Sequence, residues 1–299
     1  MEGFEMGKVK VLTARQAADL IKDGDTVTLS GFVANGIAEA LNAAAEERFL
    51  ETGHPKDLTL FWVAGTGNKD GSHADHYAHE GMVKKVIGGH FNFVPKICEM
   101  LSENKIEGYN VPQGAIAQML RDNAARKVGT ISHVGIGTFA DPRNGGGRLS
   151  EKTKEDIVKI IELEGQEQLF YPRIPLDVAF IRGTYADELG NITLEKEMAP
   201  LDATSQAMAV HNNGGLVVVQ VERVVKAGHL DPKLVKIPGI YVDAVVECPA
   251  DDPKQSQSIN CTYDPAYAGN TQVPVSSLEP KKLDAKKIIG RRAAMELKK

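Results

Sequence analysis

Short runs of apolar residues alternate along this chain with longer segments in which apolar residues recur at helical spacing. A short apolar run predicts a strand buried on both faces, and the longer segments predict amphipathic helices. Strands are predicted at residues 25–30, 58–64, 83–87, 177–182, 191–194, 215–222 and 240–248. Helices are predicted at residues 37–50, 94–103, 113–125, 205–211 and 283–297, the first ending before Gly53. Because strands and helices alternate, we predict an α/β fold with an open, mainly parallel sheet flanked by helices.

Two regions interrupt this alternation. Residues 133–150 contain five glycines and a proline, which is too flexible and too long for a simple connection and predicts a functional loop or lid. Residues 249–280 are rich in Asp, Ser, Gln, Asn, Thr and Pro and predict an irregular linker or surface excursion. The predicted organisation is therefore an α/β domain over residues 1–248, a linker over residues 249–280 and a basic amphipathic helix within residues 281–299. Turn residues at positions 187–191 predict a tight hairpin inside the domain.

Composition and charge exclude several classes of protein. The 299 residues include 35 basic and 40 acidic side chains, a formal charge of −5, and no basic block that would follow a phosphate backbone. No apolar run approaches the roughly 20 residues that cross a bilayer, and the first residues lack the apolar core of a secretory signal. Cys98, Cys248 and Cys261 are far apart and predict reduced thiols. We therefore predict a cytoplasmic protein that binds neither nucleic acid nor membrane.

Glycines at the first strand–helix junction form the first candidate site. The segment Ser30-Gly-Phe-Val-Ala-Asn-Gly-Ile37 lets the backbone turn sharply and exposes amides at a helix start, where a carboxylate or phosphate could bind. It lacks the GxGxxG spacing and a suitably placed acidic residue after the next strand. From these residues alone, an ordinary tight turn explains the segment at least as well.

Two further segments could contribute to acyl-transfer chemistry. Val111-Pro-Gln-Gly-Ala115 has a proline followed by a polar residue, a sequence that is common at the start of a helix. The amide N–H of Gln113 could also stabilise an oxyanion that develops in a tetrahedral intermediate. The segment from Gly135 through Gly137 and Arg143 to Gly147 is either a mobile surface loop or a lid. In the second case its backbone N–H groups and Arg143 could meet an anion.

Histidines and glutamates elsewhere are assigned less specific roles. His73, His76 and His79 recur every three residues and would form a slanting stripe on a helix, where a zinc site is conceivable. No H-E-x-x-H pattern or fourth ligand is evident, so we expect no metal site and a solvated or pocket-facing stripe. Glu195 and Glu197 could suggest paired carboxylates, but they follow the hairpin and are expected to be solvated.

Several separated motifs resemble the first, or alpha, half of class I coenzyme A-transferases. Residues 217–246 are similar to the end of that half, where a buried strand is followed in the same order by Glu222, Gly228, Asp231-Pro232, Pro238-Gly239 and Val242-Asp243. Ser30-Gly31-Phe32, with Gly36-Ile37 and Glu39, resembles the family segment G-G-F-x-x-x-G-x-P-E, with Ala38 in place of proline. Residues 137–147 are similar to the pattern G-T-F-x-D-P-R-x-G-G-G of the propionate and acetate CoA-transferase branch.

The resemblance runs from Val9 to about Lys299 and implies a fold of the NagB/RpiA-like kind. It implies exchange of CoA between a short-chain acyl-CoA and a free short-chain carboxylic acid, through a glutamyl-CoA thioester. CoA is then a substrate, and no permanently bound cofactor is expected. Gln113 matches a P-Q-G segment whose glutamine is an oxyanion donor in related succinyl-CoA transferases. The substrate-binding residues implied are Gly31, Phe32, Gly36, Gly135, Gly137 and Arg143.

In this family the nucleophilic glutamate lies in the second, or beta, half, and no glutamate here has the family's E-x-G setting. The resemblance therefore implies a beta-type second half or chain as partner, with this chain inactive alone because of truncation, cleavage or a separate subunit. A homo-oligomer is also expected. The acids that are exchanged remain open.

Two other functions remain open on these residues. A sugar-phosphate isomerase or a ligand sensor would share the same broad fold and use strand-end glycines to hold phosphates. A non-catalytic subunit or fragment that only binds a partner is the other alternative. Protection by acyl-CoA would indicate a transferase, and protection by sugar phosphates would indicate the isomerase or sensor.

Overall fold

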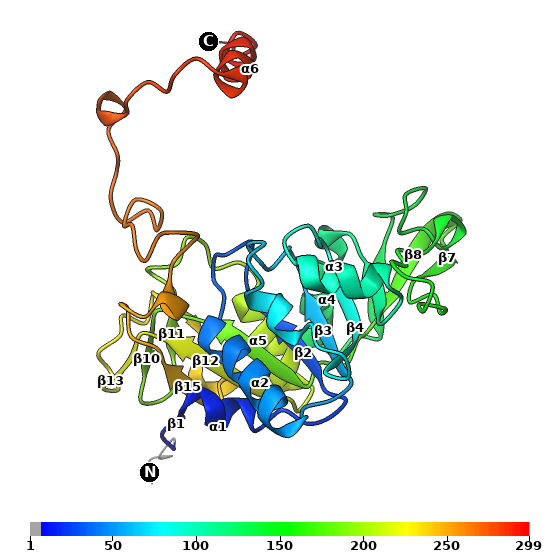
Figure 1. The fold of residues 1–299 in the computed structure, drawn as a ribbon, viewed down its shortest axis with the longest axis horizontal. Helices are drawn as coiled ribbons and strands as arrows, with labels where there is room; N and C mark the ends of the chain where they lie inside the picture. The colour runs from blue at the N-terminus through cyan, green and yellow to red at the C-terminus, as the bar shows by residue number, and fades with distance from the viewer. Residues whose placement is uncertain (1–6, 299) are drawn as a thin grey trace.

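A sheet of eight strands forms the centre of the protein in the computed structural model, which describes residues 7–298 (Figure 1). The strand order is β1-β15-β12-β9-β2-β3-β4-β5, and every neighbouring pair is parallel. The strands are β1 (Lys10–Leu12), β15 (Ala244–Glu247), β12 (Leu216–Val221), β9 (Val178–Arg182), β2 (Thr26–Leu29), β3 (Leu58–Trp62), β4 (Val83–Gly88) and β5 (Glu107–Asn110). The predicted open parallel α/β sheet is confirmed. The predicted features of residues 1–6, and Lys299 at the end of the predicted last helix, lie outside the described residues.

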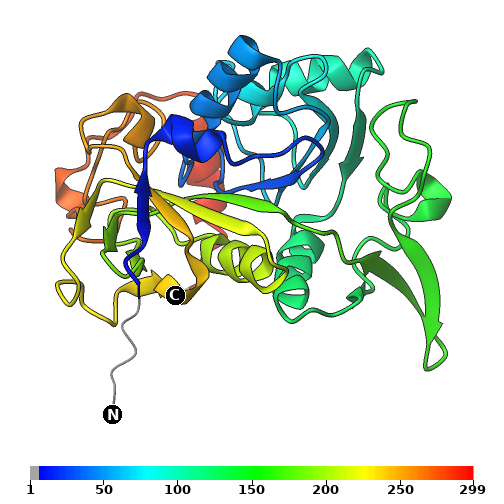
Figure 2. The same cartoon turned by 90° about the horizontal axis from the view of Figure 1, so that it is seen from below.

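Helices cover both faces of this sheet (Figure 2). One face packs against α1 (Ala14–Ala18), α2 (Glu39–Thr52) and α3 (Pro95–Ser102), and the other packs against α4 (Gln113–Ala124) and α5 (Ala203–Asn212). Successive residues of a strand point to opposite faces, so in β3 Leu60 and Trp62 join the first core while Phe61 joins the second. Because both faces are buried, the central strands are continuous apolar runs.

Local residue choices end and start the helices where the sequence predicts. Helix α2 ends at Gly53, whose φ of +71° continues the chain in the left-handed region, and its N–H donates to Phe49 O. Helix α3 begins at Pro95, whose missing N–H costs nothing in the first turn. The Asp75 carboxylate, in a short 3-10 helix at residues 73–77, accepts the N–H of Ile97 at 3.1 Å and so caps the start of α3.

Two smaller sheets flank the large one. Strands β13 (Arg223–Val225), β10 (Tyr185–Asp187), β11 (Ile192–Thr193) and β14 (Val235–Ile237) form the first, and β6 (Gly129–Ser132), β8 (Gln166–Pro172) and β7 (Lys159–Leu163) form the second. The predicted hairpin is confirmed, because β10 pairs antiparallel with β11 and Asp187 Oδ1 accepts the N–H groups of Leu189 and Asn191, both at 2.9 Å. The strand predicted at residues 240–248 begins only at Ala244, after the short 3-10 helix η3 (Gly239–Tyr241).

The region after β15 combines a docked part with an extended part. Four more 3-10 helices are η1 (His73–Tyr77), η2 (Pro142–Asn144), η4 (Pro253–Gln255) and η5 (Val275–Ser277). Gln255 and Gln257, just at and after η4, are each only 1% exposed. Farther on, the chain leaves the body and ends in α6 (Ala285–Ala294), which Figure 1 shows apart from the sheets. Among residues 7–298, no helix combines the length and apolarity that a membrane span requires.

Candidate active site

The strand order of the large sheet reverses between β2 and β9. From β2 the chain builds outwards through β3, β4 and β5, whereas β9, β12 and β15 build in the other direction. Open parallel sheets bind ligands beyond the carboxyl ends of the strands at such a point, because the two loops diverge there. The Ser30 N–H donates to Phe180 O at 3.1 Å, and the Arg182 N–H donates to Ser30 Oγ at 3.3 Å. The topology thus places the glycine loop, residues 30–37, at the expected ligand-binding edge.

The glycine loop needs glycine at two positions. Gly31 has φ +123° and Gly36 has φ +66°, and a Cβ on Gly31 would lie 1.9 Å from Ile37 Cδ1. The Ser30 hydroxyl donates to Gly36 O at 2.6 Å and closes the loop onto itself. Phe32 projects outward with 45% of its surface exposed. Substrate binding by Gly31, Phe32 and Gly36 remains a prediction, and the loop's shape alone already requires both glycines.

Backbone hydrogen bonds join the glycine loop to the loop after β3. The Val33 N–H donates to Gly65 O at 2.6 Å, and the Gly67 N–H donates to Val33 O at 2.9 Å. A Cβ on Gly67 would lie 2.2 Å from Phe93 O, so only glycine fits there. The sequence analysis did not single out this second loop, although its G-T-G pattern directly after a buried strand was a visible signal.

Gln113 lies at the same sheet edge, three strands away from the glycine loop. It is the first residue of α4, which follows β5 after a two-residue turn, and its side chain is exposed. Gly89 at the end of β4 makes room for it, since a Cβ on Gly89 would lie 2.4 Å from Gln113 Cγ. Gln113 thus stands at a helix start, beyond the carboxyl end of a strand, and this is the region in which open parallel sheets bind their ligands. Its role as oxyanion donor remains a prediction.

The loop that carries Gly135, Gly137 and Arg143 lies beside β5 and β8. Its end is joined to the carboxyl end of β5, where the Asn110 N–H donates to Gly147 O at 2.7 Å. The Arg143 guanidinium binds the Asp141 carboxylate at 2.7 Å and the Glu167 carboxylate at 2.7 Å. The guanidinium that the sequence offers to an anionic ligand is therefore already bound to two carboxylates of the protein. A substrate role for these three residues stays a prediction.

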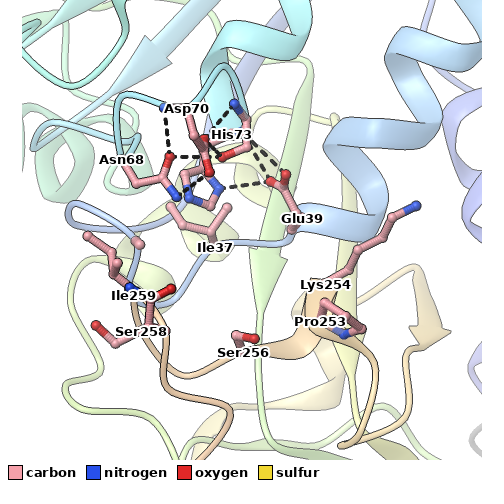
Figure 3. A pocket seen from close by; sticks show the side chains of 13 residues that line it. Ile37, Glu39, Asn68, Asp70, His73, Pro253, Lys254, Ser256, Ser258 and Ile259 are labelled. Carbon is pink, nitrogen blue, oxygen red and sulfur yellow. Dashed lines mark hydrogen bonds and ion pairs between the residues drawn. The ribbon is translucent and has the colours of Figure 1, made fainter.

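A pocket of about 370 Å³ opens between the glycine loop and the chain after η4 (Figure 3). Figure 3 shows Glu39, Asn68, Asp70 and His73 on one side and the 253–260 segment across from them. We call it the His73 pocket; it is lined by Ala34, Ile37, Glu39, Asn68, Asp70, Ser72, His73, Pro253, Lys254, Ser256, Ser258, Ile259 and Asn260. None of the seven residues predicted as the site lines it, but Glu39 and Ile37 from the predicted glycine segment do.

A buried ion pair underlies the glycine loop and corrects one expectation. Glu197 is not solvated: its side chain is 2% exposed and its Oε1 accepts the Arg182 Nε–H at 3.1 Å. Burial raises the pKa of the Glu197 carboxyl, and Arg182 opposes that shift. The same guanidinium donates to Ser256 O and so fixes the segment that forms one wall of the His73 pocket. The expectation was wrong because a hairpin position says nothing about what later segments cover.

The three histidines of the predicted stripe lie in a buried cluster with two glutamates of α2. His73 Nδ1 lies 2.8 Å from Glu39 Oε2, and His76 Nε2 lies 2.8 Å from Glu39 Oε1. His76 Nδ1 contacts Glu46, and His79 Nε2 lies 2.6 Å from the other oxygen of Glu46. The stripe is therefore mostly buried rather than solvated, and at His73 it faces a pocket, which was the second alternative. Among residues 7–298, no group of His, Cys, Asp or Glu is arranged to hold a metal ion.

Ionisation in this His–Glu cluster follows from its hydrogen bonds. Burial alone would raise the pKa of Glu39, but hydrogen bonds from His73 and His76 outweigh it and lower the pKa to about 2. Burial alone would lower the pKa of His76, but hydrogen bonds to Glu39 and Glu46 raise it overall. Glu39 is therefore ionised at neutral pH, and His76 favours its protonated form.

Acid is expected to remove stability that Glu39 contributes. Its pKa is about 2 in the folded chain against 4.5 as the unperturbed value, so the contribution is full above pH 4.5 and disappears as the pH falls towards 2. Urea unfolding of the wild type and of Glu39→Gln across that window should show a difference in unfolding free energy that shrinks with falling pH. Glu47→Gln, an exposed position on the same helix, controls for loss of a charge. A difference that stays constant across the window would contradict the assignment.

Comparisons with known proteins agree with the predicted family. The model of the coenzyme A transferase family matches residues 11–248. The chain is 40% identical over 296 residues to acetate CoA-transferase YdiF of Escherichia coli K12, covering 98% of this chain and 55% of that protein. It is also 40% identical over 290 residues to caffeate CoA-transferase of Acetobacterium woodii, covering 97% of this chain and 55% of that protein. This chain thus spans about half the length of the curated relatives it matches.

A solved structure shows the same fold. The acyl-CoA transferase YdiF from Escherichia coli O157:H7, described as a thioester complex with CoA, matches with a TM-score of 0.89 and 40% sequence identity. The match covers 97% of this chain and 55% of that chain. The family model alone spans most of the chain, from β1 through the last strand of the large sheet. This protein chain belongs to the coenzyme A transferase family.

Proposed function

We propose that this chain is the alpha-type half of a short-chain acyl-CoA:carboxylate CoA-transferase of the propionate and acetate type. The observation that carries the proposal is the position of the glycine loop and Gln113 at one edge of the sheet, beyond the carboxyl ends of β2 and β5. The relatives named as acetate and caffeate CoA-transferases support the reaction class. The share of their length that this chain matches, 55%, supports a second half that completes the site.

The proposed reaction proceeds through carboxyl exchange on a glutamate of the second half. The glutamate carboxylate attacks the acyl-CoA carbonyl and CoA thiolate leaves, which forms a mixed anhydride. The thiolate then attacks the glutamyl carbonyl and releases the first acid, which leaves a glutamyl-CoA thioester. The second acid attacks that thioester and the same steps run in reverse, so a new acyl-CoA forms and the glutamate is restored. Each step exchanges one leaving group for another and consumes no redox equivalent.

Each carbonyl attack develops a negative charge on oxygen. The Gln113 amide N–H, at the start of α4, is the donor that this chain would supply to that oxyanion. The glycine loop would border the acid, since Ala34 and Ile37 of this loop line the His73 pocket. We further propose that the complete protein is a cytoplasmic homo-oligomer and that CoA acts as substrate only.

The full protein that contains this chain should convert acetyl-CoA and propionate into propionyl-CoA and acetate, followed by chromatography of the CoA esters. Incubation with acetyl-CoA alone should leave CoA bound covalently to a glutamate outside residues 1–299, detected by mass spectrometry of peptides. Exchange without this adduct would overturn the covalent route. Absence of exchange, together with protection of the protein by sugar phosphates, would favour the isomerase or sensor instead.

A further inference from the structure

His73 lines its pocket, and one of its ring nitrogens has no hydrogen-bond partner in the described chain. The residue is 7% exposed, and its Nε2 is buried without a hydrogen-bond partner among residues 7–298. Its backbone has φ +62°, a left-handed conformation that is uncommon outside glycine and is held only where the surroundings over-determine it. An unsatisfied buried imidazole nitrogen at a pocket wall is costly unless a ligand completes it.

Glu39 fixes which nitrogen of the ring carries a proton. The Glu39 Oε2 accepts from His73 Nδ1 at 2.8 Å and from the His73 backbone N–H at 3.2 Å. An ionised carboxylate only accepts hydrogen bonds, so Nδ1 must carry a proton. In the neutral ring the Nε2 atom therefore presents a lone pair, and it can bind an anion only after taking up a second proton.

The His–Glu cluster behind His73 already carries negative charge. Glu39 and Glu46 contribute two negative charges, and a protonated His76 between them balances one. A proton that enters together with the acid leaves the net charge of the pocket unchanged, which avoids adding an uncompensated charge to a mostly buried site. His79, 28% exposed at the far end, connects the cluster to the surface through Glu46.

Other charged groups around the pocket do not replace His73. Asp70 is bound by Ser72 Oγ and Asn68 Nδ2, and Asp75 accepts N–H groups of α3, so both carboxylates are occupied by the protein. Lys254 reaches the pocket from η4 but is 45% exposed and lies 4.0 Å from Glu47. The titratable and charged groups that surround His73 are Glu39 and Glu46 of α2, Asp75, His76 and His79 of the η1 region, Asp70, Lys96 of α3 and Lys254.

We propose that His73 is the carboxylate-binding residue of this pocket and that its Nε2 takes up one proton from solvent when the free acid enters as an anion. The identity of the acid rests on the proposed function. Neutral donors on Asn68, Ser256 and Ser258 border the same space, while Ile37 and Ile259 offer apolar surface to a short acyl tail. A carboxylate that enters with one proton adds no net charge beside Asp70 and Glu39, whereas a doubly charged phosphate with one proton would add one negative charge. No bond other than the new N–H forms or breaks.

The test is proton-linked binding of sodium acetate to the full protein, with sodium chloride as the ionic control. Long-range proton–nitrogen NMR of the histidine rings should show Nε2 of His73 changing from acceptor to protonated as acetate saturates. Because one proton binds with each acetate, the acetate Kd should rise with pH, by up to about tenfold per pH unit. This wild-type dependence needs no variant.

His73→Asn assigns the effect to this residue, because asparagine tolerates a left-handed backbone and does not titrate. Acetate should bind about tenfold or more weakly at slightly acidic pH, and the pH dependence should vanish. His54→Asn is the matched control, since His54 pairs with Asp23 at 2.8 Å beyond the other end of α2 and is 47% exposed. It should bind acetate as the wild type does.

Absence of acetate binding, a ring that stays neutral at saturation, or an unchanged pH dependence in His73→Asn would each overturn the inference. If acetyl-CoA exchange persists in that case, the proposed function stands and only the His73 site fails. If acetate binds with proton uptake but no exchange of CoA occurs, the proposed function fails and the carboxylate site stands by itself.

Discussion

Replacing Gln113 by alanine is expected to lower kcat/KM for CoA exchange by about a hundredfold, as loss of one oxyanion donor does in acyl transfer. The side chain is exposed at the first position of α4, so its removal takes little from the packed core. Rates with acetyl-CoA and propionate, measured beside the melting temperature, separate a catalytic effect from a folding effect. The expected result is a slow enzyme with an unchanged melting temperature.

Gln118→Ala is the matched control for this variant. Gln118 lies on the same helix, where its side chain accepts from Arg121 at 3.1 Å and donates to Asp122 at 3.2 Å, away from the sheet edge. It should leave the exchange rate within about twofold of the wild type, because it touches no proposed reacting group. A Gln113→Ala enzyme as fast as Gln118→Ala would remove Gln113 from the site.

Replacing Arg182 by methionine is expected to lower the unfolding free energy by about 3–5 kcal/mol, since it leaves the Glu197 carboxylate buried without a counter-ion. The two side chains are only 3% and 2% exposed, so water cannot replace the lost partner. The guanidinium also holds Ser256 O, and that contact disappears with it. Urea denaturation monitored by circular dichroism measures the change.

A double variant distinguishes two causes of destabilisation, the unpaired charge on Glu197 and the packing lost with the Arg182 side chain. Arg182→Met combined with Glu197→Leu should recover most of the loss, because two apolar side chains can occupy a buried ion-pair site at little cost. Arg15→Met removes ion pairs with Asp19 and Glu51 in which Arg15 is 39% exposed and its partners are 50% and 61% exposed, and it should cost much less than Arg182→Met. Equal losses for Arg182→Met and Arg15→Met would contradict the buried-pair account.

The large sheet could be predicted from the sequence because each of its buried strands is marked by its own short apolar segment. Strands β3, β9 and β12 are buried on both faces, so each is a run in which all residues but one are apolar. The end of α2 and the start of α3 could also be predicted, because the backbone preferences of Gly53 and Pro95 suit those positions. Strands β7 and β8 were not predicted, because β7 has no buried residue and β8 buries only Leu169 and Tyr171, which leaves no long apolar run.

The pocket could not be predicted, because its parts meet only after folding. Glu39 and His73 are far apart along the chain, and they meet because α2 packs against η1. The segment around Gln255 has the polar composition of a linker, yet its amide donates to Gly183 O at 3.2 Å and accepts from Gln220 at 2.6 Å. Polar residues that satisfy one another can be buried as well as apolar ones, and composition alone does not reveal this.

The pairing of β1 with β15 sets the order in which this domain can assemble. Lys10 pairs with Ala244, so the first strand finds its neighbour only after nearly the whole domain has been synthesised. Contacts of such long sequence separation carry a large loop-closure cost and form late in folding. During synthesis, residues 10–12 must therefore wait as an unpaired edge while β2 to β5 are already able to associate. We therefore expect β1 to join the edge of the sheet late, when the two ends of the domain sequence come together.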